Sequence, residues 1–185
     1  KNLIKDPPVE RDLNVTLEEI NNGAEKKMKL NRKVENDQGN ATTEEKIFTI
    51  NIKPGWKEGT KITFSKEGDR LNRHIPSDII FIIKDKPHPL FSRDSDNNII
   101  FVAKIKLYEA LCGTIIVVPT LEGTTRSLSV QGVINPKTTR IISNMGLPLP
   151  KTPEKRGDLI VKFDIEFPIS LSESEQQTLK RILKK

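Results

Sequence analysis

An internal repeat constrains the fold of this chain more than any other feature of its sequence. Residues 17–23 (Leu-Glu-Glu-Ile-Asn-Asn-Gly) align with residues 107–113 (Leu-Tyr-Glu-Ala-Leu-Cys-Gly), ninety positions further on. In each copy the pattern predicts a strand that runs into about one helical turn, which a glycine ends before the next strand. A proline-containing turn, a glycine, and an aspartate before a strand then follow in the same order in both copies. Four matches in one order favour two homologous β-domains in tandem.

Short alternating runs predict an all-β fold with few, short helices. In residues 26–32 the alternation puts Met28 and Leu30 on one face, and we expect the lysines on the other. The continuous apolar run at residues 79–83 predicts a central strand, and the polar residues 36–45 predict a flexible hairpin loop. The other predicted strands are residues 12–17, 46–52, 61–65, 99–107, 114–119, 126–130, 139–142 and 158–167.

The repeat divides the chain into predicted domains at residues 9–87 and 88–168, followed by a tail at residues 169–185. A helix is predicted from Ser172, because Ser172 and Glu175 have the spacing of a capping box and basic residues lie at the other end. Leu179, Ile182 and Leu183 form a narrow apolar stripe on this helix. So short a helix needs a surface to cover, which is either its own domain or a second copy of the chain.

The charge balance limits the possible partners. The chain has 185 residues, and its net charge of +6 could attract nucleic acid, acidic peptides or anionic membranes. The charges of both signs are interspersed, however, so a solvated mixed surface accounts for them equally well. Stacking of nucleic-acid bases needs aromatic side chains, which are 5 % of the chain. We therefore expect no nucleic-acid binding.

Cysteine usage and hydropathy bear on the compartment. Cys112 is the one cysteine, so an internal disulfide and a thiolate zinc cluster are both excluded, as expected in a reducing, cytoplasmic environment. No run approaches the ~18 apolar residues of a membrane span, and the first residues lack the apolar core of a signal peptide. The sequence does not begin with Met, and we expect it to be part of a longer protein.

Catalytic and metal-binding motifs do not occur in the sequence. There are two histidines: His88 is expected to be structural and His74 solvated. Asp94 and Asp96 resemble the start of a calcium loop, but no glycine or distal glutamate follows at the required spacing, so a turn is the better interpretation. We expect no catalytic residues, no metal and no cofactor, and therefore not an enzyme.

Several motifs together resemble the C-terminal region of DnaJ-type co-chaperones. They are Lys-Pro-Gly-Trp-Lys-Glu-Gly-Thr-Lys-Ile at residues 53–62, Gly-Asp at 68–69, His-Pro-Leu-Phe-Ser-Arg-Asp at 88–94, the 107–113 motif, and Arg-Gly-Asp-Leu-Ile-Val at 156–161. They follow the family order from about Val9 to Leu183. The lone cysteine rules out the zinc-binding insert of class I, so class II is implied. The J-domain lies outside this sequence, and the chain by itself is not expected to stimulate the ATPase of the seventy-kilodalton heat-shock partner.

The resemblance implies two β-sandwich-like or barrel-like domains, a C-terminal dimerisation helix, and a hydrophobic groove in the first domain that takes extended, non-native polypeptide. The implied peptide-binding strand is residues 26–32, with Leu13, Val15, Met28, Leu30 and Phe91 as groove residues. Relatives use lysines here for the acidic Glu-Glu-Val-Asp tail of the heat-shock partner. The implied tail-binding residues are Lys26, Lys27 and Lys29, and the dimerisation residues are Leu179, Ile182 and Leu183.

Three alternatives to these roles remain open from the sequence. Met28 and Leu30 could fill a core, because one face of such a strand must be buried, and the lysines could solubilise an exposed edge. A family member can also serve as a scaffold that holds an assembly together without capturing clients.

Overall fold

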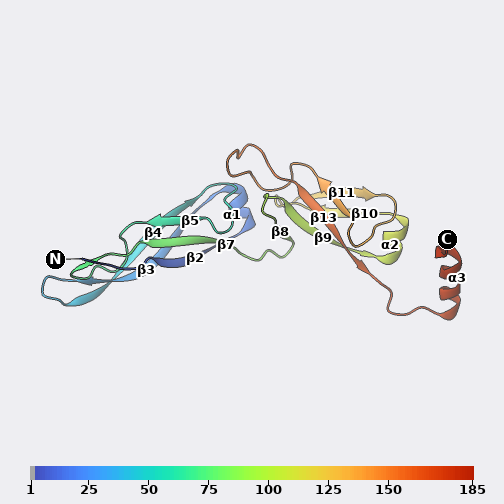
Figure 1. The fold of residues 1–185 in the computed structure, drawn as a ribbon. Coiled ribbons are helices and arrows are strands. Elements are labelled where there is room, and N and C mark those ends of the chain that lie inside the picture. The colour runs from blue at the N-terminus through green and yellow to red at the C-terminus, as the bar shows by residue number, and fades with distance from the viewer. Residues whose placement is uncertain (1–2) are drawn as a thin grey trace. The chain divides into compact units, whose positions relative to one another are not determined.

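The computed structural model describes residues 3–185, which fold as two compact units (Figure 1). Unit 1 comprises Lys1–Ile99 and Ser143–Leu159, and unit 2 comprises Ile100–Ile142 and Ile160–Lys185. Strands dominate and the helices are short, which confirms the predicted all-β class. The units interleave in the sequence, whereas the predicted domains are continuous, and the boundaries 9–87, 88–168 and 169–185 stay a prediction.

Unit 1 contains a three-stranded sheet built around an apolar central strand. Its order is β2 (Val9–Val15), β7 (Ile79–Asp85) and β5 (Lys61–Phe64), with β7 parallel to β2 and antiparallel to β5. The predicted central position of residues 79–83 is confirmed. Ile79, Phe81 and Ile83 point into the core, and the last two are fully buried.

A long hairpin forms the second sheet of unit 1. β3 (Ala24–Glu35) pairs antiparallel with β4 (Ala41–Ile52) along the whole length of both strands. The predicted loop at residues 36–45 is therefore right for residues 36–40, which form the hairpin turn, and wrong for residues 41–45, which belong to β4. The Asn36 side chain accepts hydrogen bonds from the N–H groups of Gln38 and Asn40, which closes a tight turn. Residues 41–45 are exposed on both faces, so their sequence shows no apolar alternation.

An aromatic cluster joins the β3–β4 hairpin to the three-stranded sheet. The ring of Phe48 in β4 lies 5.0 Å from Phe64 in β5 and 5.6 Å from Phe81 in β7. The contact with Phe81 is edge-to-face and that with Phe64 is tilted, and edge-to-face contacts at such distances are favourable beyond the area that they bury. The cluster fixes the hairpin against the three-stranded sheet and thereby sets the position of β3.

Short elements complete unit 1. β1 (Ile4–Lys5) pairs with β6 (His74–Ile75), and β8 is Phe91–Arg93. The sequence analysis missed these strands because two or three residues show no periodicity. The predicted helical turn is confirmed as α1 (Leu17–Asn22), which has a capping box between Thr16 and Glu19.

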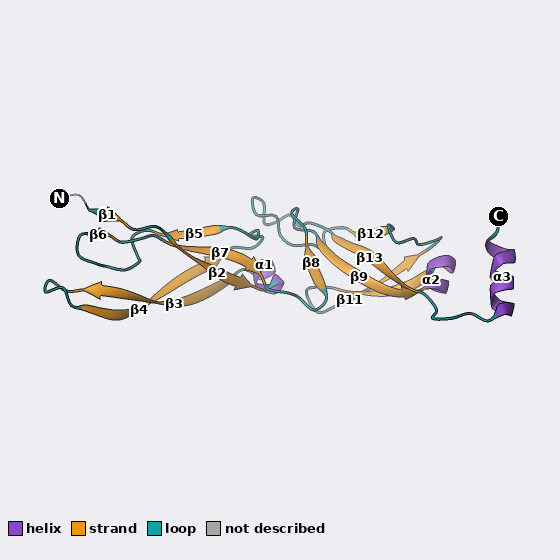
Figure 2. Ribbon diagram, turned by 60° about the horizontal axis from the view of Figure 1, so that its bottom comes forward, coloured by secondary structure: helices purple, strands orange, loops and turns teal. Residues whose placement is uncertain are grey.

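Unit 2 contains most of the second copy of the repeat (Figure 2). Its strands are β9 (Ile99–Lys106), β13 (Leu159–Glu166) and β12 (Thr139–Ile142), which lie side by side, and the hairpin β10 (Thr114–Pro119) and β11 (Thr125–Val130). Its helices are α2 (Leu107–Cys112) and α3 (Glu173–Leu183), and Ser172 caps α3 as predicted.

The local geometry of the two copies agrees. Gly23 after α1 has φ 78° and ψ 157°, and Gly113 after α2 has φ 86° and ψ 158°. Lys66 and Asn144 both have positive φ, and the backbone N–H of each donates to the aspartate before the following strand, Asp78 or Asp158. Equivalent turns are thus built the same way in both copies.

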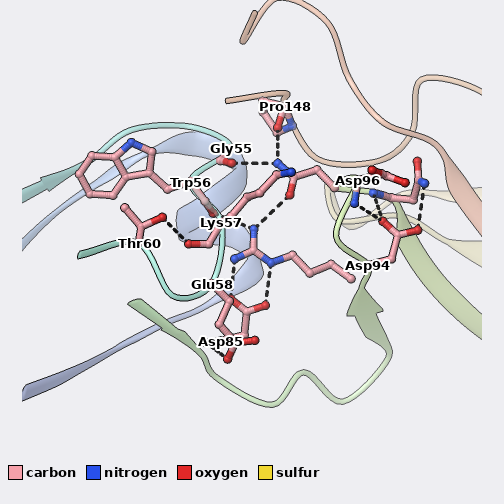
Figure 3. A network of polar contacts seen from close by, with 12 residues as sticks. Gly55, Trp56, Lys57, Glu58, Thr60, Asp85, Asp94, Asp96 and Pro148 are labelled. Atoms are coloured by element: carbon pink, nitrogen blue, oxygen red, sulfur yellow. Dashed lines mark hydrogen bonds and ion pairs between the residues drawn. The ribbon is translucent and has the colours of Figure 1, made fainter. Parts of the chain in front are cut away.

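A buried polar network fixes the loops of unit 1 (Figure 3). Arg93 forms two 2.6 Å bonds to the carboxylate of Asp85. The Nδ2 group of Asn97 donates to the backbone oxygens of Gly55 and Pro148, at 2.8 Å each. Gly55 has φ 84°, and a Cβ there would lie 2.4 Å from the Pro148 oxygen, so only glycine fits. The turn expected at Asp94 is confirmed, because the Asp94 oxygen accepts from the Asn97 N–H.

Among the described residues, no helix combines the length and the apolar character needed to cross a membrane.

Candidate functional site

One edge of β3 is largely open. β3 bonds to β4 along its other edge, and within residues 3–185 no second strand joins it, apart from a single bridge between Val34 and Arg70. The strand therefore offers N–H and C=O groups to an extended chain from residue 25 to residue 31. The bonds of Lys33 and Glu35 to the segment 69–70 show that the odd-numbered residues are the ones that face this edge.

The even-numbered side chains of β3 face the body of unit 1. Met28 stands opposite Phe48 of β4, and Leu30 stands opposite Lys46. Met28 and Leu30 are both half-buried, whereas Phe48 is 3 % exposed. The two β3 side chains therefore lie at the margin of the core, where part of each surface stays accessible.

A hollow of about 410 Å³ adjoins the open edge of β3. Leu30 and Phe48 contribute apolar surface from the hairpin, and Val9 and Ile79 contribute it from the other sheet. Charged side chains of both signs surround this surface: Asp6, Arg11, Arg32, Lys46, Glu67 and Asp69. The hollow combines an apolar floor with polar walls, as ligand grooves usually do.

The structure brings some of the predicted groove residues to this hollow and not others. Leu30 lines it, and Met28 lies two residues away on the same face. Leu13 and Val15 of β2 are 2 % and 0 % exposed, and their strand pairs with β7 rather than with β3. Phe91 is 6 % exposed and its ring packs against that of His88, at 5.1 Å.

The three predicted tail-binding lysines lie on two faces of β3. Lys27 and Lys29 are exposed on the outer face, and the ammonium of Lys29 lies 3.4 Å from the Glu45 carboxylate. The expectation that all lysines oppose Met28 is wrong for Lys26, which points the same way as Met28. Its ammonium donates to the Asn14 oxygen at 2.8 Å and lies 3.1 Å from the Glu19 carboxylate.

The contact with Lys26 affects the ionisation of Glu19. Burial raises the pKa of Glu19, but the hydrogen bond from the Thr16 backbone N–H and the bond from Lys26 outweigh it. The net pKa lies below the ordinary value. Glu19 therefore stays ionised at neutral pH and holds Lys26 across to α1.

Arg32 closes the far end of the open edge. Its side chain is 6 % exposed and bonds to Glu44 at 2.9 Å and to Glu67 at 2.7 Å. Burial lowers the pKa of the Arg32 guanidinium, but the bonds to the two carboxylates outweigh burial, so the pKa lies above its ordinary value. The same guanidinium holds the pKa of Glu44 below the usual range. Arg32 thus stays charged and links β3 to the segment at Glu67 through an ion pair.

Val9, Arg11 and Phe48 also line the hollow, and none of them was predicted from the sequence. The alternation in β2 puts Val9 and Arg11 on the same face as Leu13, and the register of the hairpin puts Phe48 beside Met28. Strand period alone could therefore have indicated the first two, whereas Phe48 required the pairing register.

The two histidines have partners in the structure. His88 Nε2 lies 2.7 Å from a Glu18 oxygen, while its Nδ1 accepts from the N–H groups of Leu90 and Phe91. His74 Nδ1 lies 2.9 Å from Asp6. His88 has the structural role predicted for it, whereas His74 is only part-exposed and paired, which corrects the expectation that it is solvated. The described residues contain no group of three or more His, Cys, Asp or Glu side chains that could hold a metal ion.

Comparison with known proteins decides the family. The model of the DnaJ C terminal domain family matches residues 9–168. The chain belongs to the DnaJ C-terminal domain family. It is 49 % identical over 180 residues to DnaJ protein homolog 1 of Drosophila melanogaster. The match covers 97 % of this chain and 53 % of the relative.

Other DnaJ relatives agree. Human DnaJ homolog subfamily B member 5 is 49 % identical over 181 residues, covering 97 % of this chain and 52 % of the relative. Protein SIS1 of Saccharomyces cerevisiae is 34 % identical over 174 residues, and the match covers 92 % of this chain and 47 % of the relative. The predicted resemblance to the C-terminal region of class II DnaJ proteins is confirmed. The chain spans about half the length of these relatives.

Proposed function

We propose that this chain is the client-binding module of a class II J-domain co-chaperone. In this proposal an extended, non-native polypeptide adds itself as a strand to the open edge of β3. The observation that carries the proposal is that edge, with Met28 and Leu30 half-buried beside it and Leu30 lining the adjoining hollow. Backbone pairing is nearly independent of the guest's sequence, and the apolar surface favours guests with apolar side chains. A thioether such as that of Met28 adapts to different guests.

The acidic tail of the seventy-kilodalton heat-shock partner is the second proposed ligand. Lys27 and Lys29 present exposed ammonium groups on β3, at the edge that would pair with the tail. Lys26 belongs to the same predicted set, but it can bind the tail only by exchanging its contact with Glu19 for one with the tail. Exposed charge pairs are individually weak and are screened by salt. Docking of the tail would therefore be modest in affinity and sensitive to salt.

Fluorescence anisotropy with two labelled peptides, one ending in Glu-Glu-Val-Asp and one apolar and extended, would test both ligands. Both should bind, and the acidic peptide should lose affinity as salt rises. Replacing Lys27 and Lys29 by Ala should weaken the acidic peptide about tenfold and leave the apolar peptide nearly unchanged. Replacing Lys104 and Lys162, exposed lysines of unit 2, by Ala is the matched control.

Client capture and docking of the acidic tail can be rejected separately. Absence of acidic-peptide binding at low salt rejects tail docking and leaves client capture in place. Absence of apolar-peptide binding, together with failure to suppress aggregation of a denatured model protein, rejects client capture. The scaffold role would then be favoured, provided that the chain still self-associates.

A further inference from the structure

The open edge of β3 ends before the strand does. At Lys33 the backbone N–H donates to the Asp69 carboxylate at 2.8 Å, and the backbone oxygen accepts from the Arg70 N–H at 2.7 Å. Two residues further, the Glu35 N–H donates to the Arg70 oxygen at 2.9 Å. These are the edge-facing groups of the last part of β3. The segment 67–70 is here called the strap. Its Asp69 side chain occupies the Lys33 N–H, and its Arg70 backbone occupies the Lys33 oxygen and the Glu35 N–H, so a guest backbone cannot use these groups.

The strap is held in place from both sides. Arg32 binds the Glu67 carboxylate and, at 3.3 Å, the Glu67 backbone oxygen. On the other side, the Gly68 N–H donates to the Ser77 oxygen at 2.9 Å, and a Cβ on Gly68 would lie 2.0 Å from the Ser77 hydroxyl. The strap therefore cannot move aside without breaking the part-buried Arg32–Glu67 ion pair and a backbone hydrogen bond.

The opposite end of the groove is also bounded. The Lys26 side chain crosses from β3 to the end of β2, where it donates to the Asn14 oxygen. Between this crossing and the strap, the edge-facing residues that stay open are Lys27, Lys29 and Asn31. Five residues of strand measure about 16 Å at ~3.3 Å per residue. This stretch, residues 27–31, is here called the guest window.

We propose that Asp69 is a stop that limits how far a guest strand can extend along β3 and so fixes its register. The inference rests on the proposed function, since it needs a guest at this edge. Asp69 acts by occupying the Lys33 N–H, the first backbone donor beyond the guest window. It is a positioning residue, because it withholds one pairing site and so decides which guest residues face Met28 and Leu30.

The test combines amide exchange with a series of apolar peptides of increasing length, using the whole chain. In the natural sequence, a bound peptide should slow exchange at Lys27, Lys29 and Asn31, and affinity should stop rising once the guest window is filled. Asp69→Ala should speed exchange at Lys33 in the free protein by tenfold or more. The longer peptides should then protect Lys33 and gain about fivefold in affinity, as one net hydrogen bond allows.

Two controls separate the stop from a general loosening. Asp69→Asn keeps a side-chain oxygen acceptor and should behave like the natural sequence. In Asp69→Ala, continued protection of the Glu35 amide shows that the strap is still docked. If peptides protect the guest window but Asp69→Ala changes neither Lys33 exchange nor the limiting length, the stop is overturned and client capture stands. If no peptide protects residues 27–31, the binding site on β3 and its stop are both overturned.

Discussion

At the scale of single residues, Asn97 lies in a turn, and its side chain holds two distant loops of unit 1 together. Its side chain is fully buried and gives both of its amide protons to backbone oxygens, those of Gly55 and Pro148. Its backbone φ of 60° suits asparagine better than most side chains. One amide thus ties together segments that lie more than ninety residues apart in the chain.

Replacing Asn97 by Asp should destabilise unit 1 by at least about 2 kcal/mol. The new side chain has nearly the same shape, but its carboxylate cannot donate to two buried carbonyl oxygens and would face them as a charge. Urea unfolding at neutral pH measures the loss. Asn144→Asp is the matched control, because Asn144 has a φ of 61° and an exposed side chain. Equal stability of the two variants would contradict the role assigned to Asn97.

Residues of the candidate site differ in how far the sequence predicts them. The alternation of the strand placed Met28 and Leu30 on one face, because side-chain direction in a strand follows from parity alone. The groove beside them was implied by the family resemblance. The same parity turns Lys26 inward, but a lysine is ordinarily assigned to solvent, and its partners Asn14 and Glu19 are known only from the tertiary fold. Contacts with the strap likewise depend on a loop that no periodicity describes.

At the scale of elements, the tie between β3 and the strap makes part of the stability depend on pH. The Arg32 hydrogen bond lowers the pKa of Glu44 in the folded state. A carboxyl whose folded pKa is depressed stabilises the fold above its unfolded pKa, and that stability is lost as the pH falls through the folded pKa. The loss therefore lies at and below about pH 4.5, the ordinary range for glutamate.

Glu44→Gln should accordingly lower stability at pH 7 and make it less dependent on pH between 5 and 3. Urea unfolding at several pH values compares the variant with the natural sequence. Glu122→Gln, in the exposed turn after β10, serves as the control, since Glu122 forms no ion pair within the described part of the chain. If the free energy of unfolding of Glu44→Gln falls with pH as steeply as that of the natural sequence, the ion pair between Glu44 and Arg32 does not contribute to the pH dependence.

Elements of four residues or more could be predicted from the sequence, with limits. Apolar alternation identified β3 and β5 because one face of each is buried, and a continuous apolar run identified the central strand β7. Alternation failed for the first part of β4, residues 41–45, since a hairpin that is solvated on both faces leaves no apolar pattern. It failed for β1, β6 and β8 because each is held by a partner strand that the local sequence does not reveal.

At the scale of the whole chain, the two copies of the repeat have diverged where their hairpins face solvent. Glu25 and Lys27 on the outer face of β3 correspond to Ile115 and Val117 on β10, which are 70 % and 62 % exposed. The first copy therefore presents charge on this face and the second presents apolar surface. A shared fold thus leaves the outer faces of the two hairpins chemically distinct, so the tail-binding role proposed for Lys27 does not carry over to Val117.

The last residues of unit 2, in α3 and just before it, expose several large apolar side chains to solvent. Phe167 and Ile169 precede α3 and are 64 % and 105 % exposed, and Ile182 and Leu183 on α3 are more than half exposed. Leu179 lines a hollow of about 430 Å³ together with Leu107, Tyr108 and Leu111 of α2. α3 therefore keeps an apolar stripe with room beside it, and a second copy of the chain is the partner that we propose for it.

Removing residues 172–185 should therefore convert a dimer into a monomer. The natural chain should sediment at about twice its 21.0 kDa mass and the shortened chain at about a single chain mass. Changing Leu179, Ile182 and Leu183 to Ser should have the same effect at full length, because it removes only the apolar stripe. Changing the exposed Glu173 and Gln177 to Ala is the control and should leave the dimer intact. A shortened chain of unchanged association state would mean that α3 covers its own unit.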